Sequence, residues 1–168
     1  MKPHQFSSVL LALVFILPGV VRADPVQETR RVIQSRYDQF DRAYMKKEFK
    51  AVAEIFAPKC MMKLNGEGRS MSARRVIKGM EALSNSLTIS HARTHILSVK
   101  TSGSEYEVIA VWTGESTYVP VSKSKEDPAR RSKTKQNVCD IWQKTDNGWQ
   151  IRQRIIKDAE DDTQPNTK

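Results

Sequence analysis

Asp140 is the residue of this sequence best placed to do chemistry. It lies in the first of two alternating segments, rich in β-branched and aromatic residues, that flank Asn147-Gly148. Such a pattern predicts a β-hairpin. A two-residue loop would pair Asp146 with Trp149, and a four-residue loop would pair Lys144 with Trp149. Both pairings place the same set on the more apolar face: Val138, Asp140, Trp142, Trp149, Ile151, Gln153 and Ile155. Because that face should meet the core, Asp140 is expected among core-facing side chains.

A carboxylate in that position has two possible roles. Buried carboxyl groups can exchange protons near neutral pH, so Asp140 is a candidate catalytic acid or base. Buried carboxyl groups are also usually satisfied by hydrogen bonds within the fold, which would make Asp140 structural. The residue types leave both roles open.

The N-terminus has the features of an export signal. A short apolar run over 9–17 is followed by Pro18-Gly19 and then by small residues at Val21 and Ala23. The run is shorter than the roughly 20 residues that a membrane span requires. We therefore expect a signal peptide over 1–23, cleavage after Ala23, a periplasmic or secreted product and no stable membrane insertion.

Removal of those 23 residues leaves 145 of the 168, enough for one domain with a single core. Lys2 and Arg22 are lost from 28 basic residues, so 26 remain against 19 acidic ones, a net charge of +7. The basic residues form no block with interleaved aromatics, and the densest stretch, 123–135, reads as a solvated loop. We expect no nucleic-acid partner for an exported chain of this kind.

Hydrophobic periodicity predicts an α+β domain in which helices precede a long antiparallel meander. Helices are expected over 26–45, over about 49–56, and from an N-cap at Ser72. Strands are expected over 60–64, 68–71, 88–100 and 105–119 and in the hairpin, with a polar connection over 120–133. The tail over 159–168 lacks apolar residues and is expected to be disordered, which leaves a domain over 24–158.

This order of elements resembles the nuclear transport factor 2-like fold, and within it the SnoaL-like group. The likeness is carried by residues 37–44 (YDQFDRAY), 49–57 (FKAVAEIFA) and 142–152 (WQKTDNGWQIR). It covers roughly 27–156. The resemblance implies a cone-shaped domain with a curved mixed or antiparallel sheet and three N-terminal helices packed on its concave face. Its relatives include isomerases, polyketide cyclases, epoxide hydrolases and binding modules without a reaction.

The resemblance also implies a pocket between sheet and helices, for a small apolar or amphipathic ligand. The residues expected to line it are Tyr37, Asp41, Tyr44, His95, Trp112 and Trp142, with Asp140 as the acid or base of a late strand. No cofactor is expected. For each of these residues, packing or internal hydrogen bonding is the alternative to ligand contact.

Two enzymes of this fold can be compared with the chain residue by residue. Steroid isomerases place a general-base aspartate eight positions beyond the phenylalanine that ends the second helix; counting from Phe56 reaches Leu64. Tyr37 matches their oxyanion donor, but a carbon acid also needs a base, so we reject that activity. Epoxide hydrolases need an Asp-Arg-Asp cluster, for which Asp140 and Arg93 supply only two members.

The cysteines and histidines show no metal-ligand spacing. His91 and His95 fall in a predicted strand, and Cys60 and Cys139 are isolated. In the resembled fold, the first and fifth strands flank the last. The two cysteines would then be about 10 Å apart, beyond the roughly 7 Å that a disulfide spans. We therefore expect no metal site and no disulfide.

Three functions remain. The first is an exported binding or accessory domain without catalysis, which we favour. The second is a cofactor-independent cyclase, isomerase or hydrolase that uses Asp140 with Tyr37 or His95. The third is an interaction module in which the basic stretch over 123–135 and the sheet face bind an acidic partner or envelope surface. A homodimer is expected as well, because an outer hairpin face that is half apolar is typical of a dimer surface. That face is expected to carry Cys139, Ile141, Gln143, Gln150, Arg152, Arg154 and Ile156.

Overall fold

The computed structural model describes residues 24–64, 70–120 and 129–165. The predicted signal peptide and residues 123–128 of the basic stretch therefore lie outside the described residues. The prediction of a loop is wrong for residues 130–135, which are part of a strand that begins at Arg130. None of the helices in the described part is both long and apolar enough to cross a membrane.

Three helices lie along the sheet: α1 (Pro25–Met45), α2 (Phe49–Glu54) and α3 (Ala73–Ala82). Asp24 caps α1 by accepting from the Val26 amide at 3.0 Å. The predicted N-cap of α3 is confirmed, since the Ser72 hydroxyl accepts from the Arg75 amide at 3.3 Å. A single 3-10 turn, η1 (Ser84–Ser86), leads from α3 into the sheet.

Helix α2 is shorter than the sequence pattern predicted. We expected Phe56 on its apolar stripe, but Phe56 begins a strand. The Ile55 carbonyl accepts from the Ile151 amide at 2.8 Å, and Phe56 then pairs with Ile151. Pairing with a distant strand therefore ends the helix before Ala57-Pro58 can.

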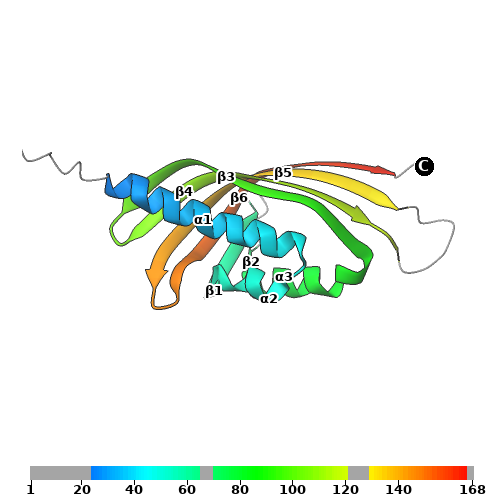
Figure 1. Cartoon of the computed structure of the whole chain (residues 1–168), viewed down its shortest axis with the longest axis horizontal. Coiled ribbons are helices and arrows are strands. Elements are labelled where there is room, and N and C mark those ends of the chain that lie inside the picture. The colour runs from blue at the N-terminus through cyan, green and yellow to red at the C-terminus, as the bar shows by residue number, and fades with distance from the viewer. Residues whose placement is uncertain (1–23, 65–69, 121–128, 166–168) are drawn as a thin grey trace, which may run out of the picture.

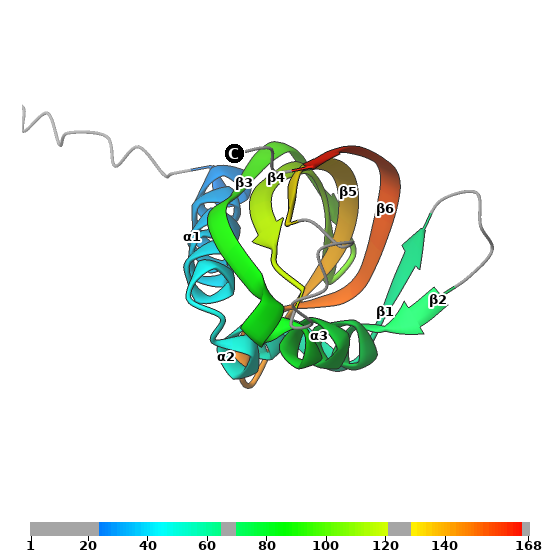
Figure 2. The same cartoon turned by 90° about the vertical axis from the view of Figure 1, so that its right-hand side faces the viewer.

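Six strands form one mixed, curved sheet (Figures 1 and 2). They are β1 (Phe56–Leu64), β2 (Ser70–Ser72), β3 (Leu87–Ser102), β4 (Glu105–Tyr118), β5 (Arg130–Thr145) and β6 (Gly148–Pro165). Their order is β2-β1-β6-β5-β4-β3, and only β1 and β6 run parallel. Strands β1 and β5 flank β6, which confirms the predicted strand order. The α+β class and the curved sheet beside three helices are confirmed as well.

The core lies between helix α1 and the concave sheet face. Its fully buried apolar side chains include Ile33, Tyr37, Val52, Ile96, Val108, Val138, Trp142 and Ile151. These residues come from α1, α2 and four strands, so burial of their combined apolar surface joins the helical and sheet layers.

Side chains of α1 cover the free edge of strand β3. Gln34 donates to the Thr94 carbonyl at 2.8 Å and accepts from the Ile96 amide at 3.3 Å. Arg30 donates to the Ile96 carbonyl at 2.7 Å, and Asp41 accepts from the Thr94 amide at 2.6 Å. Unpaired edge groups invite pairing with another chain, so these contacts satisfy and protect the edge.

The prediction of a disordered tail from residue 159 is wrong for residues 159–165. Strand β6 continues to Pro165 and pairs with the start of β5, opposite Arg130 (Figure 1). The two strands have complementary charge: Lys135 lies 3.8 Å from Glu160, and the Ser132 hydroxyl donates to Asp161. The prediction of disorder rested on the composition of the tail alone. It did not take into account the partner strand, which supplies backbone hydrogen bonds and opposite charges.

The hairpin has the predicted turn but a changed register beyond it. Lys144 pairs with Trp149, as one of the two predicted pairings requires. A bulge after Ile151 then shifts the pairing, so that Asp140 lies opposite Arg154. The predicted inward positions of Gln153 and Ile155 are therefore wrong; Arg154 and Ile156 turn inward instead, because one extra residue exchanges the two faces of a strand.

Candidate functional site

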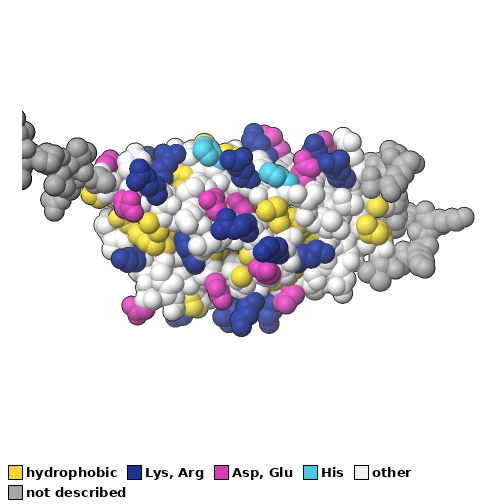
Figure 3. Space-filling view, viewed as in Figure 1, with side chains coloured by type: hydrophobic (Ala, Val, Ile, Leu, Met, Phe, Trp, Pro, Cys, Tyr) yellow, Lys and Arg dark blue, Asp and Glu magenta, His cyan; other side chains and the backbone are white. Residues whose placement is uncertain are grey.

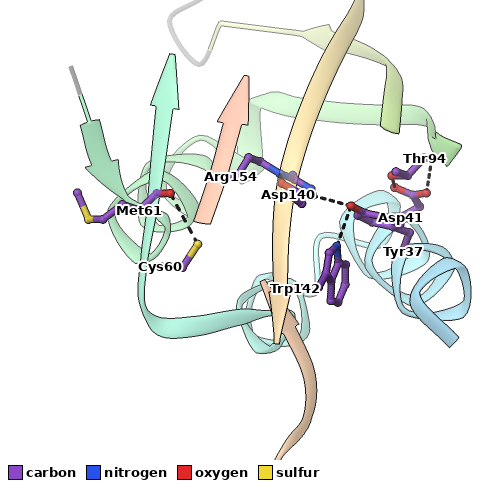
Figure 4. A network of polar contacts seen from close by, with 8 residues as sticks. All are labelled: Tyr37, Asp41, Cys60, Met61, Thr94, Asp140, Trp142 and Arg154. Carbon is purple, nitrogen blue, oxygen red and sulfur yellow. Dashed lines mark hydrogen bonds and ion pairs between the residues drawn. The ribbon is translucent and has the colours of Figure 1, made fainter. Parts of the chain in front are cut away.

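Asp140 faces inward, as predicted, and holds a buried polar network together (Figure 4). Arg154 donates to it twice, from Nε to Oδ1 at 2.8 Å and from Nη2 to Oδ2 at 2.6 Å. The Tyr37 hydroxyl donates to Oδ2 at 2.6 Å and accepts from the Trp142 indole Nε1 at 3.0 Å. Four side chains from α1, β5 and β6 thus satisfy one another inside the core.

The electrostatics of this network fix its protonation. Burial, reinforced by Asp140 and opposed by Arg154, raises the pKa of Tyr37 well above its ordinary value. Burial works to lower the pKa of the Arg154 guanidinium, but the Asp140 carboxylate outweighs it and holds that pKa above its usual range. Tyr37 therefore stays neutral and Arg154 stays charged, so neither group can exchange a proton near neutral pH.

A cavity of about 290 Å³ lies on the other side of Arg154, between the helices and the concave sheet face. Aromatic and aliphatic side chains form most of its wall, including Phe40, Tyr44, Phe56, Met62, Val76, Ile77, Met80, Trp112 and Ile156. Arg154, Gln136 and Thr134 contribute polar groups. An apolar cavity with a few convergent polar groups is typical of a small-molecule site.

Arg154 forms the boundary between the network and the cavity. Its guanidinium carbon lies 5.3 Å from the Phe56 ring centroid and 5.8 Å from that of Phe40. Both bonds to Asp140 use Nε and Nη2; within the part of the chain that the structure describes, Nη1 has no hydrogen-bond partner. The aromatic rings thus hold a cation whose remaining donor group is available to a ligand.

Trp112 supplies a second donor without a partner. Its Nε1 is buried, and no acceptor lies within hydrogen-bond reach in the described residues. The ring stacks edge to face with Tyr44, at 5.8 Å between centroids. It also lies directly over Gly114, where a Cβ would come within 2.3 Å of the indole ring. Glycine at that position leaves room for the ring.

The predicted site residues separate into three groups. Tyr44 and Trp112 line the cavity, as expected. Tyr37, Trp142 and Asp140 belong to the network behind Arg154 rather than to the cavity wall. For Asp140 this geometry favours the structural alternative over a catalytic one, since its two oxygens already accept three hydrogen bonds from Arg154 and Tyr37.

Asp41 belongs to neither the network nor the cavity wall. It is 4 % exposed and accepts from the Thr94 amide at 2.6 Å and from the Thr94 hydroxyl at 2.9 Å. Burial raises the pKa of Asp41, and the hydrogen bonds from Thr94 oppose that shift. This residue fastens α1 to strand β3.

His95 does not face the cavity. Along β3, Ala92, Thr94 and Ile96 are buried, whereas the residues between them are exposed. The sequence could not fix this alternation, because apolar residues occur at both parities of the neighbouring strand. His95 instead borders a shallow groove beside α1, together with Arg30. Its predicted place in the pocket is therefore wrong.

Metal-ligand side chains and thiols of the described residues were predicted to form neither a metal site nor a disulfide. No three His, Cys, Asp or Glu side chains within them converge to hold a metal ion. Cys60 and Cys139 are buried free thiols on β1 and β5, with β6 between them. Burial raises the pKa of Cys60 to about 12, which leaves it a poor nucleophile.

Sequence reasoning missed Arg154, the one charged residue that the described part of the chain contributes to the cavity wall. Strict alternation from Trp149 placed it on the outer face, and only the bulge turns it inward. A useful signal was available: a buried Asp140 requires a cation, and Arg152 and Arg154 are the only basic residues of the returning strand before Lys157.

No protein-family model matches the chain, and no curated protein matches its sequence. Solved structures of similar shape do exist. A conserved protein from Planctomyces limnophilus superposes with a TM-score of 0.63 at 10% identity, covering 83% of this chain and 98% of that one. An NTF2-like protein from Cytophaga hutchinsonii gives 0.55 at 11% identity, covering 76% and 96%.

A ketosteroid isomerase-like protein from Erwinia carotovora atroseptica gives a TM-score of 0.52 at 13% identity, covering 82% of this chain and 96% of that one. At such low identity the likeness concerns the fold, and the activities of these proteins are not carried over. Element order, sheet curvature and these neighbours agree: the chain has the nuclear transport factor 2-like fold.

Proposed function

We propose that this protein is an exported small-molecule-binding domain without catalytic activity, and that its ligand occupies the cavity of about 290 Å³ beside Arg154. The observation that carries the proposal is the closed network of Asp140, Tyr37 and Arg154 next to that cavity. The acidic group that could have served as acid or base is engaged, whereas the cavity wall remains available for binding.

Size and composition of the cavity support a compact apolar ligand. Its volume of about 290 Å³ lies just below the roughly 300–1,000 Å³ range of ligand pockets, which suits a small ligand. The wall draws on helices α1, α2 and α3 and on strands β1, β4, β5 and β6, so the packed fold forms it in advance. A preformed wall reduces the entropic cost of binding.

The test is titration with naphthalene, followed by two-dimensional amide NMR. Met80→Trp on α3 should fill the cavity and abolish binding while the fold is retained. Leu83→Trp is the matched control, because Leu83 follows α3, is 54% exposed and does not line the cavity. Equal binding by both variants, or amide shifts far from the cavity, would refute the proposed site.

A second function, homodimerisation through the outer sheet face, is favoured by one observation. All three helices lie on the concave side, and no described element covers the convex side of β4, β5 and β6 (Figure 2). Ile109, Cys139, Ile141 and Ile155 lie on that side. Arg154 and Ile156 turn inward and therefore do not belong to the predicted dimer face. Gln150 does not belong to it either, because its side chain is buried and donates to the Glu54 carbonyl.

Light scattering at micromolar concentration tests this second proposal. A dimer should give twice the mass of one mature chain, and Ile141→Lys should return it to one. Lys144→Ile, a change of charge at the far end of the same strand, should leave the mass unchanged. A mass of one chain for the unaltered protein would refute the dimer.

A further inference from the structure

Two residues of the cavity wall carry hydrogen-bond donors without acceptors in the described part of the chain. In Arg154 this donor is Nη1, and in Trp112 it is the buried indole Nε1. Neither group can act as an acceptor. A buried donor without a partner is costly, and among the two this applies to Trp112 Nε1. A ligand acceptor would relieve that cost at Trp112 and add a charge-assisted hydrogen bond at Arg154.

The charge of the site restricts the acceptor further. Among the described residues, Arg154 is the only charged one of the cavity wall, and its charge is already balanced by the bidentate contact with Asp140. A ligand carboxylate would lose its hydration in the cavity without meeting an unbalanced cation. A neutral carbonyl accepts the same hydrogen bonds at a much smaller desolvation cost.

Aromatic rings define the shape of the remaining space. Phe40, Tyr44, Phe56 and Trp112 all contribute to the wall, and Met62 and Met80 add flexible apolar surface. Flat faces favour a planar ring system, which stacks against aromatic side chains or meets them edge to face. Thioether side chains adapt to its outline.

We propose that the cavity selects uncharged, mainly aromatic molecules that carry a carbonyl-type acceptor, and that Arg154 and Trp112 bind this acceptor. The inference rests on the proposed binding function and adds the ligand class. The molecular surface carries scattered charged groups of both signs (Figure 3). The cavity wall is instead mainly apolar, with Arg154, Trp112, Gln136 and Thr134 as its polar groups.

Three probes with one ring system test the ligand class: naphthalene, 2-acetylnaphthalene and 2-naphthoate. Each is titrated into the full mature chain at pH 7 and followed by amide NMR. One or two hydrogen bonds, including one from a charged donor, should make the ketone bind about tenfold tighter than naphthalene. The carboxylate should bind at least about tenfold weaker than the ketone.

Two tryptophan variants test the donors. Trp112→Phe retains a ring but removes the N–H, so the affinity for the ketone should fall about three- to tenfold while that for naphthalene changes less than about twofold. Trp149→Phe is the matched control. Its indole packs against Tyr106, with 5.2 Å between ring centroids, and does not line the cavity. Both affinities should therefore persist.

The outcomes separate this inference from the proposed function. If none of the probes binds in the cavity, the binding function itself fails. If naphthalene binds but the ketone binds no tighter, the function stands and the ligand class is refuted. A carboxylate that binds as tightly as the ketone overturns the charge argument. An equal loss for ketone and naphthalene in Trp112→Phe overturns the donor role of Trp112.

Discussion

Replacing Asp140 with asparagine separates a structural carboxylate from a catalytic one. The side chain is fully buried, and its two oxygens accept three hydrogen bonds, two from Arg154 and one from Tyr37. Asparagine keeps the shape but has one acceptor oxygen and no charge. Its amide group must therefore face a donor, and the Arg154 guanidinium loses its counter-ion in the core.

The size of the effect follows from that lost counter-ion. Breaking a buried ion pair by removing one partner costs about 3–5 kcal/mol, because the remaining charge stays buried without compensation. Arg154 is only 7 % exposed, so solvent offers little screening. For a domain of this size, that cost lowers Tm by about 6–20 °C. It is a large part of the roughly 5–15 kcal/mol that stabilises a typical domain.

Thermal and urea unfolding, followed by circular dichroism, measure the loss. Asp158→Asn is the control: it makes the same chemical change on β6, where Asp158 is exposed and accepts one bond from Asn137 at 2.6 Å. Its Tm should shift by less than about 2 °C. A similarly small shift for Asp140→Asn would refute the structural role and return Asp140 to the catalytic candidates.

Three further changes test other parts of the site. Tyr37→Phe removes a hydrogen bond to the charged Asp140, which should cost about 1.5–3 kcal/mol in urea unfolding with the cavity unchanged; no loss would contradict the network. The pKa of Asp41 is raised above 3.8 by burial, so its contribution to stability is fully present below that pH and is lost as pH rises through the folded-state pKa. Relative to Asp41→Asn, the natural protein should therefore lose Tm between pH 3.5 and 7, and a constant difference would contradict the raised pKa. Gly114→Ala should displace the Trp112 ring and cost about 1–3 kcal/mol, with weaker naphthalene binding; unchanged binding would show that the ring can move without loss.

Local patterns in the sequence predicted the helices and the hairpin well. Helix α1 and the Ser72 cap agree with the pattern because capping and periodicity are local properties. The end of α2 at Glu54 and the continuation of β6 to Pro165 depend on pairing with distant strands. Such pairing cannot be predicted from a sequence segment of about ten residues, because the partner strand lies far away in the chain.

The sequence predicted the residues of the candidate site correctly only where it also predicted which sheet face each side chain points to. Asp140 and Trp142 were placed correctly because the turn fixes the alternation of β5. The direction of His95 could not be fixed, since the pattern of its neighbouring strand is apolar on both sides. Burial of alternate residues in β3 turns it outward.

The bulge in β6 shows how one residue determines the chemistry of this cavity. Without it, Gln153 would lie beside Asp140, and a neutral amide cannot balance a buried carboxylate. With it, Arg154 pairs with Asp140 and still presents Nη1 to the cavity. Arg152 is exposed and, within the described residues, pairs with Glu105 alone; its deletion would restore strict alternation. Gln153 would still lie opposite Ile141 and Arg154 opposite Asp140, so the buried ion pair and the polar end of the ligand site should both persist. Stability and binding therefore depend on the one-residue offset between Ile151 and Arg154, and not on the identity of Arg152.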